Sequence, residues 1–385
     1  MRDDVSDATR RASPIDTAGN AVIAKAHAAG RQRRFGQISI EVRRSASFPL
    51  RLFALAAALV TGLGLSAFAL ILVGVPAESL ADEFVSATIL DPMNFKAVLV
   101  QAAPLILVGL AAAMAFRVRF WNLGIEGQMI FGGVGATLVS LLHLGPEWAR
   151  LPLMGLAAVT CGALWASIPA LLKLRLSVNE IISTLLLNYV AYYVLLHLLY
   201  GAWKDEDGFP HSPAYAASEL LPNLDSGVSV SLVLAGGMTL LMTYLVARSR
   251  AGFYMRFVSA NPGVARALGL PVANMVLFVV LVSGSLAALA GFVVSSGQEG
   301  RLTQSFFPGY GVSGVLIGFL ARNNPVAAAV VALLMSVLVI AGQNLQVFYG
   351  IPPSMVQLIQ AVVVMSVAAS DFLVIHRVHW IRYRA

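Results

Sequence analysis

The stretch AVLVQAAPLILVGLAAAMAFRVRFWNLGIEGQMIFGGVGATLVSLLHL, Ala97 to Leu144, holds two apolar runs separated by a short polar segment. The first run, Ala97 to Phe116, has the roughly 20 residues that a helix needs to cross a bilayer. The segment NLGIEGQ, Asn122 to Gln128, leads directly into the second run. It therefore places a charge, Glu126, at the mouth of a hydrophobic segment.

The rest of the chain repeats this pattern. Of its 385 residues, 58% are hydrophobic and only 12% are charged, and the mean hydropathy is +0.79. Soluble domains carry roughly 25% charged residues. We therefore expect an all-α, polytopic membrane protein with about ten transmembrane or half-spanning helices. The apolar runs are 52–75, 97–116, 122–144, 151–172, 181–200, 228–247, 273–297, 309–321, 325–347 and 354–375.

The basic residues predict the orientation. With both termini in the cytoplasm, only four of the 26 lysines and arginines fall outside the cytoplasmic segments: Lys96, Arg150, Lys204 and Arg301. This distribution follows the positive-inside rule and does not form a patch for nucleic acid. The short run 309–321 is expected to be a half-helix or a re-entrant piece.

Three regions follow from this pattern. Residues 1–47 form a polar, basic cytoplasmic extension, residues 48–376 a transmembrane domain with a cytoplasmic loop at 248–272, and residues 377–385 a basic cytoplasmic tail. A G-x-x-x-x-G-K-[ST] phosphate loop does not occur in the sequence, so we expect this chain not to hydrolyse ATP by itself.

Polar residues inside apolar runs are costly, and those that persist usually face a cavity or a partner. Glu126 lies among glycines, which suits a broken helix whose end faces a ligand path. The alternative is that Asn122 and Glu126 cap an ordinary helix at the inner interface, with Glu126 paired to Arg117 or Arg119.

The segment SVNEIISTLLLNY, Ser177 to Tyr189, carries a second polar pattern. Ser177 and Glu180 have the spacing of a capping box. Polar residues then recur every four positions, a spacing that places them on one helix face, where they either bond to a neighbouring helix or line a passage. This stripe consists of Glu180, Thr184, Asn188 and Tyr192.

The outer segment SGQEGR, Ser296 to Arg301, interrupts the apolar periodicity, and such interruptions at membrane depth line cavities or are buried in protein. Gln298 and Glu299 are candidates for the outer mouth of a passage. Because they are next to a loop, both are equally compatible with solvation, which is favoured for Glu299.

The cytoplasmic loop contains a short helix signal. Asn261 followed by Pro262 marks a helix start, and Gly269 followed by Pro271 marks a stop. The helix between them, about two turns long, is expected to be isolated between two spans. Its small residues, Gly263, Ala265 and Ala267, suit insertion into a groove of a soluble partner.

At these residues the sequence resembles the permeases of ATP-binding cassette (ABC) importers, in the branch for nucleosides and simple sugars. The resemblance rests on NLGIEGQM at 122–129, VNEIISTLLLNY at 178–189 and GFLARNNP at 318–325, and extends from about 97 to 375. Ala321 stands where the branch usually has glycine. The segment from Arg250 to Leu270 is similar to the coupling region that docks on the ATPase.

The resemblance implies a multi-pass protein of the bacterial inner membrane that binds no cofactor or metal and has no catalytic residue. Its partners would be a cytoplasmic ABC ATPase that uses ATP with Mg²⁺, a second homologous permease, an extracytoplasmic substrate-binding protein or lipoprotein, and membrane lipid. Nucleosides are the expected substrate, ahead of ribose-like sugars and branched-chain amino acids. The substrate-pathway candidates are Asn122, Glu126, Gln128, Thr184, Asn188, Tyr192 and Gln298, and the ATPase-coupling candidates are Arg250, Gly252, Asn261, Pro262, Ala265, Arg266 and Gly269.

Two other functions are compatible with parts of the sequence. Gly311-Val-Ser-Gly314 resembles the motif of intramembrane serine proteases, but the predicted topology separates Ser313 from the histidines that follow it, His376 and His379. An ion-coupled secondary transporter would use embedded carboxylates, of which Glu126 is the clear case. Such a transporter would not need the helix that begins at Pro262.

Overall fold

The computed structural model describes residues 37–42, 47–205, 208–223, 229–307 and 309–381. These residues fall into two compact units, one made of the chain ends up to Ala56 and from Ala369, and one comprising Ala57–Ala368. The expected extension at 1–47 lies largely outside the described residues.

The unit of the chain ends contains a pair of strands. β1 (Gln37–Val42) pairs antiparallel with β2 (His376–Ile381), from Gln37 opposite Ile381 to Val42 opposite His376. The sequence pattern indicated helices only, so this pairing of the basic extension with the tail is an addition to the all-α fold.

Ten apolar helices are found in the described part of the chain, as the hydropathy pattern predicted. Eight of them contain a segment long and apolar enough to cross a membrane. These are α2 (Phe48–Val73), α4 (Pro92–Arg117), α6 (Glu147–Leu176), α7 (Glu180–Tyr200), α8 (Val230–Arg248), α11 (Val272–Val294), α13 (Pro325–Tyr349) and α14 (Pro353–Ile375). The shorter apolar helices are α5 (Ile125–Leu141) and α12 (Tyr310–Leu320).

The short helices refine the prediction. The 11 residues of α12 extend about 16 Å at about 1.5 Å per residue, roughly half of the ~30 Å hydrocarbon core. α12 is therefore a half-helix, one of the two forms expected for 309–321. α5 begins at Ile125 rather than at Asn122, because residues 118–124 do not continue the helix.

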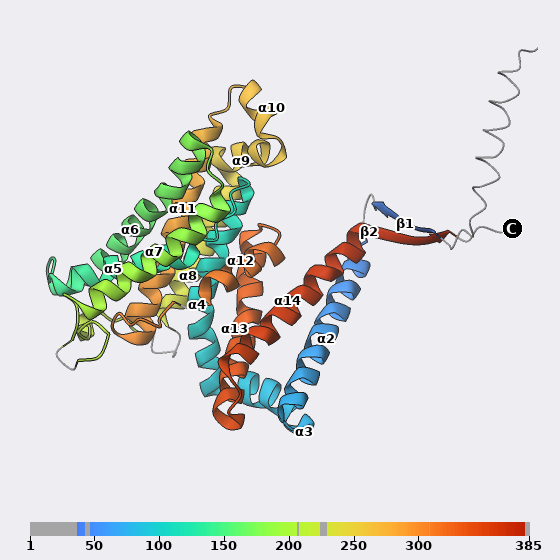
Figure 1. The fold of residues 1–385 in the computed structure, drawn as a ribbon, viewed down its shortest axis with the longest axis horizontal. Helices are drawn as coiled ribbons and strands as arrows, with labels where there is room; N and C mark the ends of the chain where they lie inside the picture. The colour runs from blue at the N-terminus through green and yellow to red at the C-terminus, as the bar shows by residue number, and fades with distance from the viewer. Residues whose placement is uncertain (1–36, 43–46, 206–207, 224–228, 308, 382–385) are drawn as a thin grey trace, which may run out of the picture. The chain divides into compact units, whose positions relative to one another are not determined.

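The remaining elements are short. The outer side carries α3 (Ala77–Ala81), the π-helix η1 (Asp82–Leu90), the 3₁₀ helix η2 (Ala217–Glu219) and the π-helix η3 (Ser295–Glu299). The loop between α8 and α11 carries α9 (Arg250–Ala260) and α10 (Pro262–Ala267), which lie beyond one end of the helix bundle (Figure 1). The expected short helix at Pro262 is confirmed, but it is not isolated, since α9 directly precedes it.

Hydrogen bonds between loops agree with the predicted sidedness. On the inner side, Arg117 donates to the carbonyl of Asn323 at 2.7 Å, and Lys173 donates to that of Arg119 at 3.2 Å. On the outer side, the backbone N–H of Ser212 donates to Leu302 O at 2.9 Å. Each bond joins loops that the basic residues place on the same face.

Small residues allow the central helices to approach closely. α4 and α11 are buried along most of their length, whereas most residues of α6 and α7 are only partly buried or exposed. A Cβ atom on Gly284 of α11 would lie 2.3 Å from Ala166 Cβ and 2.7 Å from the backbone oxygen of Gly162, both on α6. Without hydrophobic attraction between helices in lipid, such backbone approach supplies much of the packing energy.

We expect Gly284→Ala to destabilise the protein by about 1–3 kcal/mol, because the added methyl overpacks the α6–α11 contact. Gly236→Ala on α8 is the matched control, since a Cβ atom there meets nothing within 4 Å. Thermal unfolding in detergent should show a lower midpoint for Gly284→Ala and an unchanged or higher one for Gly236→Ala. Equal midpoints would contradict the close α6–α11 packing.

Candidate translocation pathway

The segment between α4 and α5 is held by a buried amide network. Asn122 Nδ2 donates to Gln128 Oε1 at 2.9 Å and to Ser283 Oγ at 3.0 Å, while Asn122 Oδ1 accepts from Gly124 N and Gln128 Nε2. Ser283 Oγ in turn donates to the carbonyl of Ala111 on α4 at 2.7 Å. Asn122 and Gln128 are fully buried, so in this structure these two candidates bind protein groups.

The polar stripe of α7 bonds to the same segment. Asn188 Nδ2 donates to the carbonyl of Leu123 at 2.7 Å, and Asn188 Oδ1 accepts from the backbone N–H of Gly127 at 2.8 Å. Thr184 Oγ1 accepts from Leu123 N at 3.3 Å. Of the two interpretations of the stripe, the structure shows bonding to a neighbouring segment.

Tyr192 continues this stripe toward the outer side. Its ring lies 5.7 Å from that of Phe307, centroid to centroid. It therefore packs against the segment that leads into α12.

The capping box expected at the start of α7 is not formed. Asn179 is the N-cap, and its side chain accepts from Ile181 N at 2.9 Å. Ser177 instead ends α6 in the left-handed conformation, with φ of 55°. Glu180 pairs with Lys173 of α6. The sequence spacing was correct for a cap, but the link between α6 and α7 is too short for Ser177 to serve α7.

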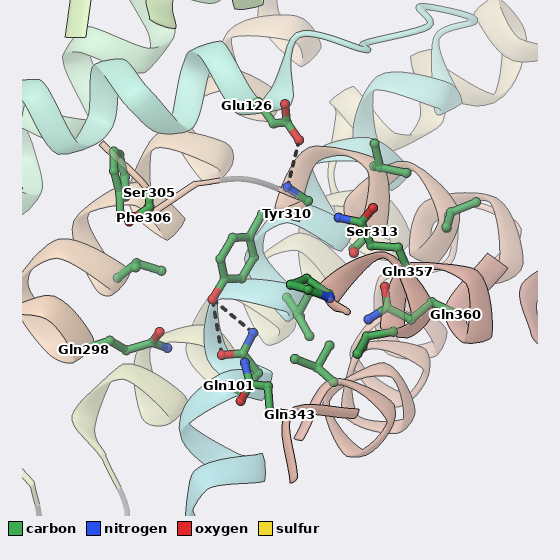
Figure 2. Close-up of a pocket in the computed structure, with 18 of the residues that line it drawn as sticks. Gln101, Glu126, Gln298, Ser305, Phe306, Tyr310, Ser313, Gln343, Gln357 and Gln360 are labelled. Atoms are coloured by element: carbon green, nitrogen blue, oxygen red, sulfur yellow. Dashed lines mark hydrogen bonds between the residues drawn. The ribbon is translucent and has the colours of Figure 1, made fainter. Parts of the chain in front are cut away.

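Glu126 joins the N-termini of the two short helices. Its Oε1 atom accepts from Gly309 N at 3.2 Å (Figure 2). The backbone N–H groups of Gly311 and Val312 also donate to the carboxylate. A negative charge at the N-terminus of α12 also interacts favourably with the helix dipole. Gly311 permits the approach, because a Cβ atom there would lie 2.4 Å from Glu126 Cγ.

The alternative interpretation, in which Glu126 pairs with Arg117 or Arg119, is wrong. Arg117 donates to Asn323, and Arg119 donates to the carbonyls of Ser259 and Ala260 at 2.8 and 3.0 Å. Both arginines act at the inner surface, whereas the 118–124 segment carries Glu126 away from them. Sequence proximity was misleading here because α5 begins later than the apolar run.

A cavity of about 690 Å³ opens beside Glu126. Residues of α4, α12, α13, α14 and η3 line it. Its polar lining consists of six glutamines, two carboxylates, two serines and a tyrosine: Gln101, Gln298, Gln343, Gln346, Gln357, Gln360, Glu126, Glu299, Ser305, Ser313 and Tyr310. Lysine, arginine and histidine do not occur among the described lining residues, so the cavity offers amides, hydroxyls and negative charge.

Tyr310 stands in the middle of this lining. Figure 2 shows its ring extending from the start of α12 toward Gln101. Gln101 Nε2 donates to the tyrosine oxygen at 3.0 Å, and the phenol lies 3.2 Å from Gln101 Oε1. Because both groups also face the cavity, a polar solute can compete for this pair.

Two of the seven predicted pathway residues, Glu126 and Gln298, line the cavity. The glutamines of α4, α13 and α14 were missed, although the signal that drew attention to Glu126 was present. Gln101 lies within an apolar run, and Gln343 with Gln346 and Gln357 with Gln360 recur at three-residue spacing, which places each pair on one helix face. Amides inside membrane segments, like charged groups, are costly to bury and therefore also indicate a cavity or a partner.

The coupling candidates lie on α9 and α10 and at their ends. Asn261 Oδ1 accepts from Gly263 N and Val264 N at 2.9 and 3.2 Å, and Pro262 occupies the first helical position. Gly269 ends α10 with φ of +75°. A Cβ atom on Gly252 would lie 2.2 Å from Val246 O, so this glycine permits the turn from α8 into α9. Ala265 is buried, while Arg250 and Arg266 are exposed.

The loop between α7 and α8, on the predicted outer side, packs against α5 and α6. Glu219 is buried and accepts from Ser140 Oγ at 2.6 Å, from Ala216 N at 3.1 Å and from Arg150 at 3.4 Å. Tyr215 shares a hydrogen bond of 2.6 Å with Thr137, and burial raises its pKa to about 12. The loop is therefore anchored on α5 by neutral and charged hydrogen bonds.

We expect Glu126→Ala to lower stability by about 1–3 kcal/mol, because it leaves the N-terminal N–H groups of α12 without their acceptor. Glu126→Gln keeps one acceptor oxygen and should fall between this variant and the wild type. Glu299→Gln is the control, as Glu299 lines the same cavity and is exposed. Thermal unfolding of the purified variants measures the order, and a Glu126→Ala midpoint equal to that of Glu299→Gln would contradict the capping role.

Comparisons with known proteins agree on one family. A family model described as branched-chain amino acid transport system / permease component matches residues 94–368. The chain is 36% identical over 304 residues to the glucose ABC transporter permease protein of Haloferax volcanii, covering 76% of this chain and 80% of that protein.

Two further relatives are similar over most of their length. The guanosine ABC transporter permease protein of Bacillus subtilis is 31% identical over 276 residues, which cover 70% of this chain and 79% of that protein. The nucleoside ABC transporter permease protein of Lactococcus lactis is 25% identical over 278 residues, which cover 69% and 76%.

Proposed function

The chain belongs to the family of permease components of branched-chain amino acid transport systems, and we propose that its own substrates are nucleosides. It is a multi-pass membrane protein and the permease subunit of an ABC importer for nucleosides or sugars. Such permeases assemble with an ATPase and are not themselves enzymes. Family membership argues against the two alternative functions, an ion-coupled transporter that uses Glu126 and a serine protease that uses Ser313.

The cavity beside Glu126 supports the choice of nucleosides. Its volume of about 690 Å³ lies within the roughly 300–1,000 Å³ of small-molecule sites. Glutamine amides both donate and accept, as the edges of nucleobases and the hydroxyls of ribose require. The absence of cations among the described lining residues disfavours phosphorylated solutes, while the Tyr310 ring offers a surface for a base.

Glucose is the second candidate, supported by the identity to the Haloferax volcanii permease. A hexose also fits a cavity of amides and carboxylates. The two candidates differ in one respect: a sugar gains little from the ring of Tyr310 beyond its hydroxyl, whereas a base can stack on it.

The proposed assembly has four kinds of component. This permease and a second, homologous permease span the bacterial inner membrane, and a cytoplasmic ATPase hydrolyses ATP with Mg²⁺. An extracytoplasmic binding protein or lipoprotein delivers the substrate to the outer side, where the anchored loop at Glu219 lies. α9 and α10 form the contact with the ATPase, through the exposed residues of these helices that do not line the inner cavity.

A chain of contacts leads from α9 to the cavity. Arg119 donates to the carbonyls of Ser259 and Ala260 at the end of α9. The covalent segment that follows Arg119 runs through Asn122 to Glu126, which caps α12 at the cavity. Movement of α9 and α10 by the ATPase therefore pulls on Glu126, and the N-terminus of α12 follows. Alternating access requires such differential contacts in two states.

Uptake measurements test the substrate. Cells with and without this gene are given labelled guanosine, uridine or glucose, each in the presence and in the absence of excess unlabelled ribose. We expect loss of nucleoside uptake on deletion, no competition by ribose and unchanged glucose uptake. Loss of glucose uptake alone would overturn the nucleoside proposal and leave the permease assignment intact.

Arg119→Gln tests the coupling path. We expect the assembled transporter to keep hydrolysing ATP while uptake falls several-fold, because a neutral amide cannot bridge the two carbonyls as the guanidinium fork does. Arg175→Gln, an exposed cation at the inner end of α6, is the control with the same charge loss. Uptake and hydrolysis that fall together, or not at all, would argue against this path.

A further inference from the structure

A second cavity, of about 760 Å³, lies on the inner side of the protein. The segment that follows α4 and the inner ends of α6 and α11 form its walls together with α9 and α10. Its lining residues are Val118, Arg119, Lys173, Leu174, Ser177, Val258, Pro262, Arg266, Pro271, Val272, Ala273, Asn274 and Val276. It shares no lining residue with the glutamine-lined cavity beside Glu126, so the proposed substrate pathway does not account for it.

This inner cavity carries excess positive charge. Arg119, Lys173 and Arg266 line it, and aspartate and glutamate do not occur among its described lining residues. Glu180 compensates Lys173 alone. Arg266 is exposed, and its side chain forms no hydrogen bond or ion pair within the described residues. Two uncompensated guanidinium groups in a concave site attract an anion, and phosphate oxygens suit their geometry.

The charged groups are preorganised by the surrounding backbone. The two carbonyl bonds of Arg119 hold its guanidinium at the end of α9, and Lys173 Nζ donates to the carbonyl of Arg119. Ser177 and Asn274 add a hydroxyl and an amide to the same lining. An anion in this cavity therefore meets cations and neutral hydrogen-bonding groups from several elements.

Apolar surface continues from the cavity along the membrane helices. Phe278 lies one turn beyond Asn274 on α11 and is 41% exposed, and Leu171 lies one turn from Leu174 on α6 and is 38% exposed. Both lie farther from the cytoplasmic ends of α11 and α6 than the lining residues do. Cations at the interface with exposed apolar side chains one turn deeper match an amphiphile with an anionic head.

We propose that this inner cavity binds the phosphate of an anionic glycerophospholipid from the cytoplasmic leaflet. The phosphate lies between Arg119 and Arg266, and the acyl chains follow the exposed side chains of α6 and α11. Basic pockets between membrane helices on the cytoplasmic side bind such headgroups. Because Arg266 belongs to α10 and Arg119 reaches α9, the lipid ties the coupling helices to the membrane helices. A free phosphate ion shares the headgroup chemistry but gains nothing from Leu171 or Phe278.

Lipid binding to the full-length protein in neutral detergent tests this site. Short-chain phosphatidylglycerol, phosphatidylcholine and glycerol phosphate are titrated separately, and bound lipid is counted by native mass spectrometry alongside the thermal unfolding midpoint. We expect phosphatidylglycerol to bind and raise the midpoint, and the other two to bind at least ten-fold more weakly. Equal binding of phosphatidylcholine would overturn the proposal, and equal binding of glycerol phosphate would replace the lipid by a soluble phosphate.

Two variants locate the binding. Arg266→Gln should weaken phosphatidylglycerol binding about five-fold, as expected for one cation near a lipid headgroup. Arg256→Gln is the matched control, because Arg256 is exposed on α9 but does not line the cavity. Phe278→Ser should weaken the binding of phosphatidylglycerol without affecting the binding of glycerol phosphate. An equal loss of phosphatidylglycerol binding in Arg266→Gln and Arg256→Gln would indicate general attraction to the charged surface and would refute the site. Loss of phosphatidylglycerol binding when the transporter is assembled with its ATPase would also refute it.

Discussion

The hydrogen bonds from the start of α12 to Glu126 are the interaction on which the pathway depends. Backbone groups in the hydrocarbon region need partners, and a helix that begins inside the membrane leaves its first N–H groups unsatisfied. The carboxylate of Glu126 accepts from this helix start across a gap of more than 180 residues in sequence. It thereby allows a half-helix to begin at the cavity, next to the polar lining.

The same constraint explains the buried amides around residues 118–124. This segment is not helical, so its carbonyl groups need hydrogen-bond donors and its N–H groups need acceptors. Asn188 serves Leu123 and Gly127, while Asn122 and Gln128 serve each other and Ser283. The motif residues thus build the support that positions Glu126, and the glutamines of α4, η3, α13 and α14 line the cavity that we propose as the substrate site.

At the inner surface, the proposed coupling contact and the basic cavity share a residue. Arg119 links α9 to the segment that ends at Glu126 and also lines the basic cavity. A ligand bound there would stiffen the connection between the coupling helices and the substrate cavity. The proposals on transport and on lipid are nevertheless separable, because the substrate tests change solute uptake and the lipid tests change binding in detergent.

Hydropathy and basic residues by themselves determined the helical class, the ten apolar segments and their alternation, because these depend on local composition and on transfer into the membrane. Asn261-Pro262 likewise determined the start of α10, since a cap is local. The tertiary structure alone decided what the buried polar groups contact. Glu126 lies near Arg117 and Arg119 in sequence but caps α12, and Asn188 bonds to Leu123, because the partners of a buried hydrogen bond depend on which helices pack together.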